Sequence, residues 1–288
     1  RAAECFGTEA SRALLRTRES LANARRLAGE YDGAEKQAVD AIELARACSD
    51  LVAEGRLAQL LGFVYLETER YEEATDFAER SLAIWEDRQH PTQRARSLKI
   101  LSGAQLRRDH PEKAAEQAHD ALALFREVGD VRGETAMLNL LAMCRHEAGS
   151  FGQARQYALE ALERSLETDE RTLRGRILNN LAQANEKIGR HSEAQSRYMQ
   201  ALAWSRDIAD RQNEARVALN LSRLIESDEP HRAYILARHA RRVLEELDLP
   251  YLSEAESQVE GVSEALSQES LTQLRSDDEE RLDEILEA

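Results

Sequence analysis

Apolar residues recur through most of the chain at steps of three and four, which is the period of an amphipathic helix and not the alternation of a strand. The stretch RGRILNNLAQANEKIG at 174–189 shows this period clearly. A second kind of helical stretch, such as RYEEATDFAERSLAIWE at 70–86, places Ala74 and Ala78 on its apolar face. Small residues on an apolar face let another backbone come close, so this stretch predicts a tightly packed neighbouring helix.

The alanine-rich stretch at 70–86 has counterparts at intervals of forty residues, starting at 30, 110, 150 and 190. A sixth copy, EPHRAYILARHARRVLE, follows after the loss of one residue in the preceding turn. Three columns are nearly fixed across five copies. They hold Ala34, Ala74, Ala114, Ala154 and Ala194; then Ala38, Ala78, Ala118, Ala158 and Tyr198; then Ile42, Leu82, Leu122, Leu162 and Leu202. Composition alone does not produce such self-similarity, so the chain is built from internal repeats.

Each alanine-rich stretch, termed a second helix, follows another helical stretch, termed a first helix. The predicted unit is therefore helix, turn, helix, repeated six times at about 11–50, 51–90, 91–130, 131–170, 171–210 and 211–249. Residues 1–10 are expected to be the end of a preceding helix or a leader, so we interpret the sequence as a fragment of a longer protein. Residues 250–267 are expected to form a capping helix, and 268–288 an acidic helix or tail.

Turn signals stand where this unit needs them. Glycines are expected to close first helices, aspartates to act as N-caps, and prolines to occupy helix starts, where a missing N–H costs little. These residues are Gly29, Gly149 and Gly189; Asp50, Asp130 and Asp210; and Pro91 and Pro111.

The repeat resembles the tetratricopeptide repeat. The similarity rests on Leu61, Gly62 and Tyr65 in one first helix, on aromatic residues before the second helices, and on pairs of small residues within them. The aromatic residues are Tyr31, Tyr71 and Phe151, and the pairs are Ala34 and Ala41, Ala114 and Ala121, Ala154 and Ala161, and Ala194 and Ala201. The resemblance covers about five sixths of the chain.

The sequence departs from that family in two ways. Its period is forty residues where thirty-four is usual, and Gly62 is the only glycine at its position in the first helices. The other copies have Ala22, Ser102, Ala142, Ala182 and Ser222 there. The longer unit resembles the variant found in bacterial signalling regulators and cell-polarity scaffolds. The resemblance implies an all-α fold, a right-handed α-solenoid in which each repeat buries its apolar face against its neighbours.

Composition supports an all-α protein and narrows its partners. Gly (13 residues), Pro (4) and aromatic residues (5%) are scarce, which leaves few turn and strand formers. The formal charge of −15 argues against nonspecific binding to nucleic acid or to an anionic membrane. Three cysteines, Cys5, Cys48 and Cys144, offer neither a disulfide framework nor a metal knuckle, so a reducing, cytoplasmic location is expected.

The sequence carries no enzyme motif of the kinds that bind nucleotides, activate a serine or hold zinc. Its seven histidines do not pair at metal-ligand spacing. We therefore expect no enzyme activity, no catalytic residue, no metal and no cofactor. Oligomeric state cannot be predicted from the sequence.

A polar stripe lies opposite the apolar face of the first helices. In proteins that this chain resembles, first helices line the concave groove, so these residues are candidate partner-binding positions. They are Arg16, Asn23, Arg56, Gln59, Phe63, Arg96, Lys99, Asn139, Met143, His146, Arg176, Asn179, Gln183, Arg216 and Arg223.

Arginine leads this stripe in five of six copies, which predicts a ladder of guanidinium groups on neighbouring helices. The members are Arg16, Arg56, Arg96, Arg176 and Arg216, with Ala136 in the gap. Two interpretations stay open. The ladder is either a basic wall that attracts an acidic partner, or a set of bridges to acids on adjacent helices.

The first functional hypothesis is a noncatalytic scaffold for protein–protein interaction, whose groove binds a peptide or protein segment, possibly acidic. The alternative is a ligand- or peptide-sensing regulatory domain of a larger signalling protein such as a cyclase, kinase or transcription regulator.

Overall fold

The computed structural model describes residues 9–167, 171–249, 251–267, 270–271 and 274, and every regular element in that part of the chain is an α-helix. The chain divides into two compact units, 1–148 and 149–288. Unit 1 contains α1 (Glu9–Leu27), α2 (Tyr31–Ala47), α3 (Leu51–Glu67), α4 (Tyr71–Asp87), α5 (Pro91–Arg107), α6 (Pro111–Glu127) and α7 (Val131–Glu147). Unit 2 contains α8 (Phe151–Ser165), α9 (Arg171–Lys187), α10 (His191–Asp207), α11 (Arg211–Ile225), α12 (Pro230–Glu246) and α13 (Leu252–Glu264).

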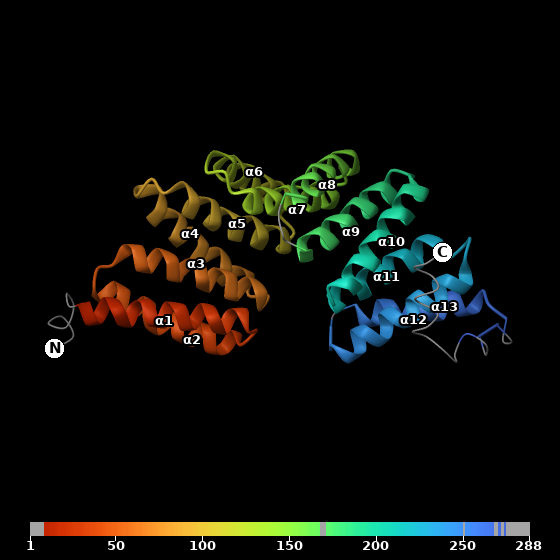
Figure 1. Cartoon of the computed structure of the whole chain (residues 1–288), viewed down its shortest axis with the longest axis horizontal. Helices are drawn as coiled ribbons and strands as arrows, with labels where there is room; N and C mark the ends of the chain where they lie inside the picture. The colour runs from red at the N-terminus through yellow and green to blue at the C-terminus, as the bar shows by residue number, and fades with distance from the viewer. Residues whose placement is uncertain (1–8, 168–170, 250, 268–269, 272–273, 275–288) are drawn as a thin grey trace. The chain divides into compact units, whose positions relative to one another are not determined.

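In unit 1 each helix packs against the next one along the chain, as Figure 1 shows for α1 to α7. The first helices α1, α3, α5 and α7 also contact one another in succession. One side of unit 1 is therefore built from first helices alone. Unit 2 follows the same rule, since α9 contacts α11 and α11 contacts α13. This consecutive packing of helix pairs makes the chain an all-α solenoid.

The alanine columns lie where the helices come closest. Ala34, Ala74, Ala114 and Ala194 are all fully buried, and Ala154 is 1% exposed. Larger residues fill the remaining space, and Tyr198 is the bulkiest of the fully buried side chains. The sequence prediction of close helix contacts at these columns is confirmed.

The turns between helices follow one design. Asp50, Asp130 and Asp210 accept hydrogen bonds from the backbone N–H three residues later, as N-caps do. The residue after each first helix's C-cap has positive φ at Gly29, Gly149 and Gly189, where glycine adopts the left-handed conformation without strain. Pro91 and Pro111 begin α5 and α6. All three predicted turn signals are confirmed.

The helix α13 lies within the segment expected to cap the array. Its Ala255 and Val262 are fully buried in the hydrophobic core of unit 2, together with Leu271 and Leu274 just after it. Most of the predicted acidic tail at 268–288, and residues 1–8 of the predicted leader, lie outside the described residues.

A set of ion pairs at the junctions between repeats was not predicted. Glu54, Glu134 and Glu214 are 5%, 6% and 5% exposed. Each carboxylate meets an arginine eight residues earlier, at the end of the preceding second helix. The pairs are Arg46 with Glu54 at 3.1 Å, Arg126 with Glu134 at 2.9 Å, and Arg206 with Glu214 at 3.6 Å.

These junctions recur every eighty residues, since Arg46, Asp50 and Glu54 return as Arg126, Asp130 and Glu134 and again eighty residues later. Two junctions lie between them. One reverses the charges, with Glu86 and Arg94 at the corresponding positions, and the other has Leu166 and Arg174 there. The doubled period of eighty residues is the sequence signal that could have predicted these ion pairs. A comparison of repeats forty residues apart does not reveal it.

Candidate interaction face of the first helices

The exposed polar side of α1, α3 and α5 in unit 1 brings together side chains that are far apart in sequence. We call it the first-helix face; it consists of Arg16, Glu19, Asn23, Arg26, Arg56, Phe63, Arg96 and Lys99. Its helices contact one another in succession. The charged groups on it are five cations and one carboxylate, so this face is basic although the whole chain carries −15.

Phe63 is the aromatic centre of the first-helix face. Its side chain is partly buried on α3. The Arg26 guanidinium lies 5.7 Å from the ring centroid and the Lys99 ammonium 6.0 Å, one from each neighbouring first helix. Cations at this distance are attracted to the electron-rich ring face. Phe63 therefore links the three helices and offers apolar area between two positive charges.

Arg56 is paired within the fold. Its Nε and Nη2 atoms donate to the two carboxylate oxygens of Glu19 at 2.7 and 2.9 Å, forming a bidentate ion pair between α3 and α1. The hydrogen bond to Glu19 raises the pKa of Arg56 above its ordinary value. At this position the ladder bridges to an acid on the adjacent first helix, which is the structural interpretation of the arginine column.

Two other ladder positions differ from Arg56. Arg16 and Arg96 are exposed, and neither has an ion pair among the described side chains. In unit 2 Arg176 is also exposed and without an ion pair in the described part of the chain. Within the described part of the chain, no carboxylate pairs with these three guanidinium groups.

Two of the predicted amides in unit 1 are buried. Gln59 is 6% exposed, and its Nε2 donates to the carbonyl of Gln93 at 2.7 Å and to Ser97 Oγ at 3.0 Å. Asn139 is 7% exposed, with its Nδ2 3.9 Å from the Met143 sulfur. Gln59 therefore joins α3 to α5. Neither amide is presented at the surface.

The remaining predicted positions of unit 1 differ in exposure. Asn23 is exposed and accepts hydrogen bonds from the Arg26 guanidinium at 3.2 and 3.4 Å. Met143 and His146 on α7 are partly buried, and His146 Nδ1 lies 3.7 Å from Glu147. The basic character of the first-helix face thus belongs to α1, α3 and α5.

In unit 2 the fold itself occupies most of the predicted polar positions. Arg223 donates to Glu254 of α13 at 2.7 Å, and Arg216 donates to Asn213 at 2.7 Å. Asn179 is 1% exposed and accepts a hydrogen bond from Asn220 at 3.1 Å. Gln183 is partly buried on α9. Unit 2 therefore presents a less open set of cations than unit 1.

No group of three or more His, Cys, Asp or Glu side chains among the described residues is placed to hold a metal ion. Cys144 is 1% exposed, and burial raises the pKa of its thiol to about 12, so this sulfur is not a nucleophile at neutral pH. None of the helices in the described ranges is both long and apolar enough to span a membrane.

An open cavity of about 570 Å³ lies in unit 1, away from the first-helix face. It sits at the charge-reversed junction between the ends of α4 and α6 and the start of α5. Its lining residues are Glu86, Gln89, Pro91, Arg94, Leu124 and Glu127. Its walls carry both signs of charge, from Glu86, Glu127 and Arg94.

Several solved structures share this fold. BtubC (BKLC) from P. vanneervenii is 21% identical, with 74% of this chain and 91% of that chain covered and a TM-score of 0.63. A Rap protein complexed with Competence and Sporulation Factor is 15% identical, with 88% and 74% covered and a TM-score of 0.63. A STAND protein with a tetratricopeptide repeat sensor, from Pyrococcus horikoshii, is 17% identical, with 88% and 40% covered and a TM-score of 0.70. At these identities the likeness concerns the fold.

No curated protein sequence matches the chain. A model of the tetratricopeptide repeat family, however, matches residues 12–87, 55–127 and 134–207, which is more than half of the sequence. Repeats of this family generally serve as noncatalytic scaffolds for protein partners. Taken with the paired helices and the buried alanine columns, the match means that the chain belongs to the tetratricopeptide repeat family.

Proposed function

We propose that the chain is a noncatalytic interaction module, and that its first-helix face in unit 1 binds an acidic segment of a partner protein. The observation that carries this proposal is the position of Phe63 between the Arg26 and Lys99 cations, with Arg16 and Arg96 exposed nearby. The preferred segment has carboxylates on either side of an apolar side chain.

Physical chemistry favours this match in two ways. Guanidinium groups form strong bidentate hydrogen bonds with carboxylates, as Arg56 does with Glu19 inside the fold. A basic face on a chain of charge −15 also concentrates the attraction for an acidic segment at one place, while the rest of the surface repels it. An apolar side chain against Phe63 adds binding energy that salt does not screen.

The alternative is a regulatory domain that senses a ligand or peptide and passes the change to another part of a larger signalling protein. Two structural neighbours favour it: the Rap protein was solved with Competence and Sporulation Factor, and the STAND protein carries its repeats as a sensor. Both alternatives place the bound partner or ligand on the repeats. We place the protein in the cytoplasm because its odd number of cysteines suits a reducing compartment.

Selection from a random peptide display library on the purified chain tests the proposal. We expect the bound peptides to be enriched in Asp and Glu around an aromatic or aliphatic residue, and their binding to weaken as salt rises because exposed charges are screened. A selection that yields basic or uncharged peptides, or peptides whose affinity does not change with salt, would rule out the acidic segment.

A further inference from the structure

The junction between α4 and α5 lacks the ion pair that closes the other acid–arginine junctions of unit 1. Those pairs join Arg46 to Glu54 and Arg126 to Glu134. Glu86 and Arg94 occupy the same positions with the charges reversed. Neither of these two side chains has an ion pair or a hydrogen bond among the described residues, and the Nε atom of Arg94 is buried without a partner. A buried donor without an acceptor costs free energy, so an acceptor for Arg94 is missing from this part of the fold.

A second arginine at the same repeat position shows what Arg94 lacks. Arg174, eighty residues later, donates to the Ser165 carbonyl at 2.6 Å and to Ser165 Oγ at 3.3 Å. The residue eighty before Ser165 is Trp85. Its side chain offers no oxygen, and its carbonyl accepts from the backbone N–H of His90. Arg94 therefore finds neither the acid of the paired junctions nor the serine that holds Arg174.

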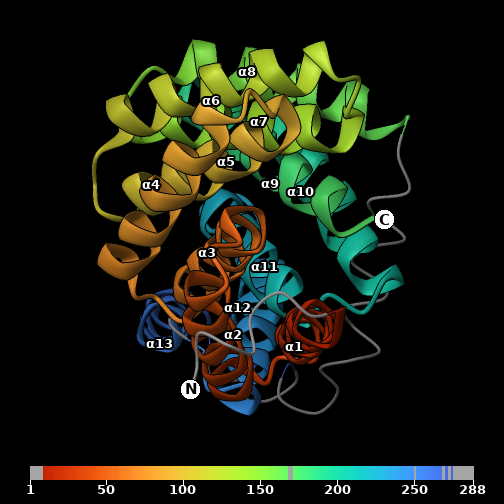
Figure 2. The ribbon, with the colours of Figure 1, turned by 90° about the vertical axis from the view of Figure 1, so that its left-hand side faces the viewer.

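Arg94 lines the open cavity of about 570 Å³ at this junction. The cavity is walled by α4, α5 and α6, which follow one another in the stack of unit 1, as Figure 2 shows. Glu86 from α4 and Glu127 from α6 are exposed on the same walls, and neither has an ion pair within the described ranges. Pro91 and Leu124 are partly buried and add apolar area. A cavity of this volume is large enough for a small molecule.

The charges of the walls restrict the class of that molecule. One guanidinium and two carboxylates give the lining a net charge of −1. The two glutamates repel a simple anion, and a simple cation leaves Arg94 without an acceptor. A ligand with one carboxylate and two cationic groups matches all three charges at once. Lysine and arginine, as free amino acids, carry this set, and their methylene groups can lie on Pro91 and Leu124 while the charges reach the walls.

We propose that this cavity is a binding site for a free basic amino acid. The carboxylate of the ligand accepts hydrogen bonds from Arg94, and its two cationic groups meet Glu86 and Glu127. This inference does not depend on the proposed function, because the cavity lies away from the first-helix face and none of its lining residues belongs to that face.

Isothermal titration of the full chain with L-lysine and with L-lysinamide tests the proposal. Lysinamide keeps both amino groups and lacks the carboxylate. At about pH 6 the α-amino group of either ligand is charged, so the comparison isolates the carboxylate. Lysine is expected to bind saturably, and lysinamide about fivefold or more weakly, because only lysine offers an acceptor to Arg94.

Two substitutions in the walls assign the ligand groups. Arg94→Gln is expected to weaken lysine about fivefold or more and to leave lysinamide no weaker than before, so the preference for lysine disappears. Glu127→Gln is expected to weaken both ligands alike, because both keep their cations. Matched controls lie on the same two helices: Arg107→Gln on α5 and Glu116→Gln on α6 change exposed residues outside the lining, so affinity should change by less than about twofold.

Four outcomes would overturn the proposal. The first is the absence of saturable lysine binding. The second is a preference for lysine over lysinamide that survives in a folded Arg94→Gln chain. The third is a loss with the control variants as large as with Arg94→Gln or Glu127→Gln; Glu127 is exposed, so its variant decides the matter even where Arg94→Gln does not fold. The fourth is binding of Nα-acetyl-lysine as tight as that of lysine, which would assign the cavity to the carboxyl-terminal residue of a peptide.

Discussion

Replacing Tyr198 with alanine is expected to destabilise unit 2 by about 3–5 kcal/mol, although the five other repeats carry alanine at this position. The ring is fully buried in the hydrophobic core of unit 2. Its hydroxyl donates to Glu186 at 2.9 Å, and burial raises the pKa of Tyr198 well above its ordinary value. The substitution therefore leaves a cavity and removes a hydrogen bond at once.

Urea unfolding, together with hydrogen exchange in α9 to α11, measures this loss. Tyr198→Phe is the matched control, because it keeps the ring and removes only the hydroxyl; it should cost about 1 kcal/mol. A Tyr198→Ala chain as stable as the original would mean that alanine, the residue of the other copies, is tolerated here. That result would contradict a structural role for the buried Tyr198 ring.

Gly133→Val is expected to destabilise unit 1 by about 3 kcal/mol through overpacking. A Cβ atom at Gly133 would clash with Cδ1 of Phe125 and lie 2.5 Å from Cγ of the same ring. Phe125 is 2% exposed and cannot swing into solvent. The two helices α6 and α7 must therefore separate to make room.

Gly152→Val is the control for this change, since nothing lies within 4 Å of a Cβ atom there. Both glycines stand in the first turn of a helix, so backbone effects should be similar and only packing should differ. Thermal unfolding is expected to separate the two variants by several degrees. Equal unfolding temperatures for the two variants would mean that the contact between α6 and α7 accommodates the added side chain, contrary to the short distances to the Phe125 ring.

The fold was predictable because alanines at fixed intervals mark the positions where its helices come closest. A helix pair can approach closely only where side chains are small, so the forty-residue columns of Ala34 and Ala38 specify both the helices and their packing. Capping aspartates such as Asp50 mark the helix starts in the same direct way.

The candidate site was less predictable, because a period indicates which side of a helix a residue lies on but not what a long side chain reaches. Arg56 and Arg96 occupy the same column, yet Arg56 pairs with Glu19 while Arg96 is exposed. The reason lies in the preceding first helix. Arg56 follows a helix that has an acid, Glu19, at the pairing position, whereas Arg96 follows a helix that has the neutral Gln59 at the same position. Such pairing depends on two columns together.

Burial also separates residues that look alike in sequence. Gln59 and Asn139 belong to the same polar stripe as Asn23, but the first two turn inward and the last is exposed. The stripe borders the helix contacts, and at that border the rotation of each helix decides whether an amide faces solvent. The charged junctions at Glu54 and Glu134 escaped prediction for a different reason, since buried carboxylates are uncommon and their recurrence is every second repeat.

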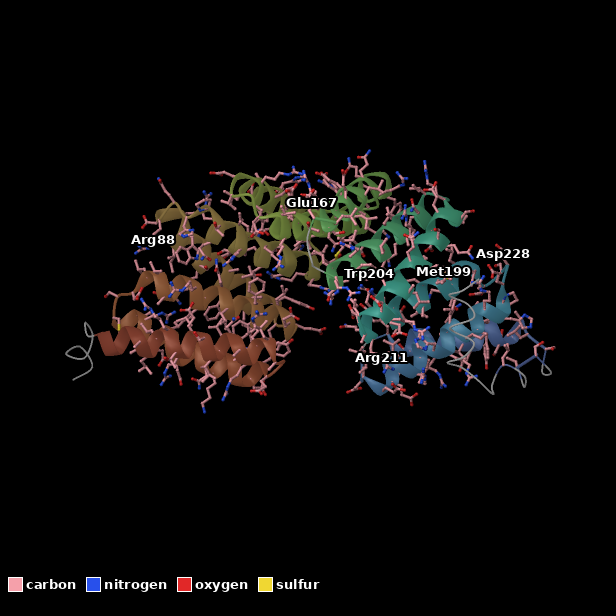
Figure 3. All side chains as sticks on the ribbon, viewed as in Figure 1. Arg88, Glu167, Met199, Trp204, Arg211 and Asp228 are labelled. Carbon is pink, nitrogen blue, oxygen red and sulfur yellow. The ribbon has the colours of Figure 1, made fainter. Side chains whose placement is uncertain are left out.

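The proposed function requires that the first-helix face of unit 1 binds an acidic segment. A matched pair of double charge reversals tests it. Arg96→Glu with Lys99→Glu alters that face, and Arg88→Glu with Lys113→Glu makes the same change in net charge elsewhere. Arg88 is the exposed C-cap residue of α4, labelled in Figure 3, and Lys113 is exposed on α6.

The measurement is the affinity of a selected acidic peptide for these two variants by isothermal titration calorimetry at low salt. We expect the first variant to lose about tenfold or more in affinity and the second less than about twofold, since only the first places like charges against the peptide. Equal losses for both variants would mean that net charge alone attracts the peptide, and would contradict a binding site on the first-helix face.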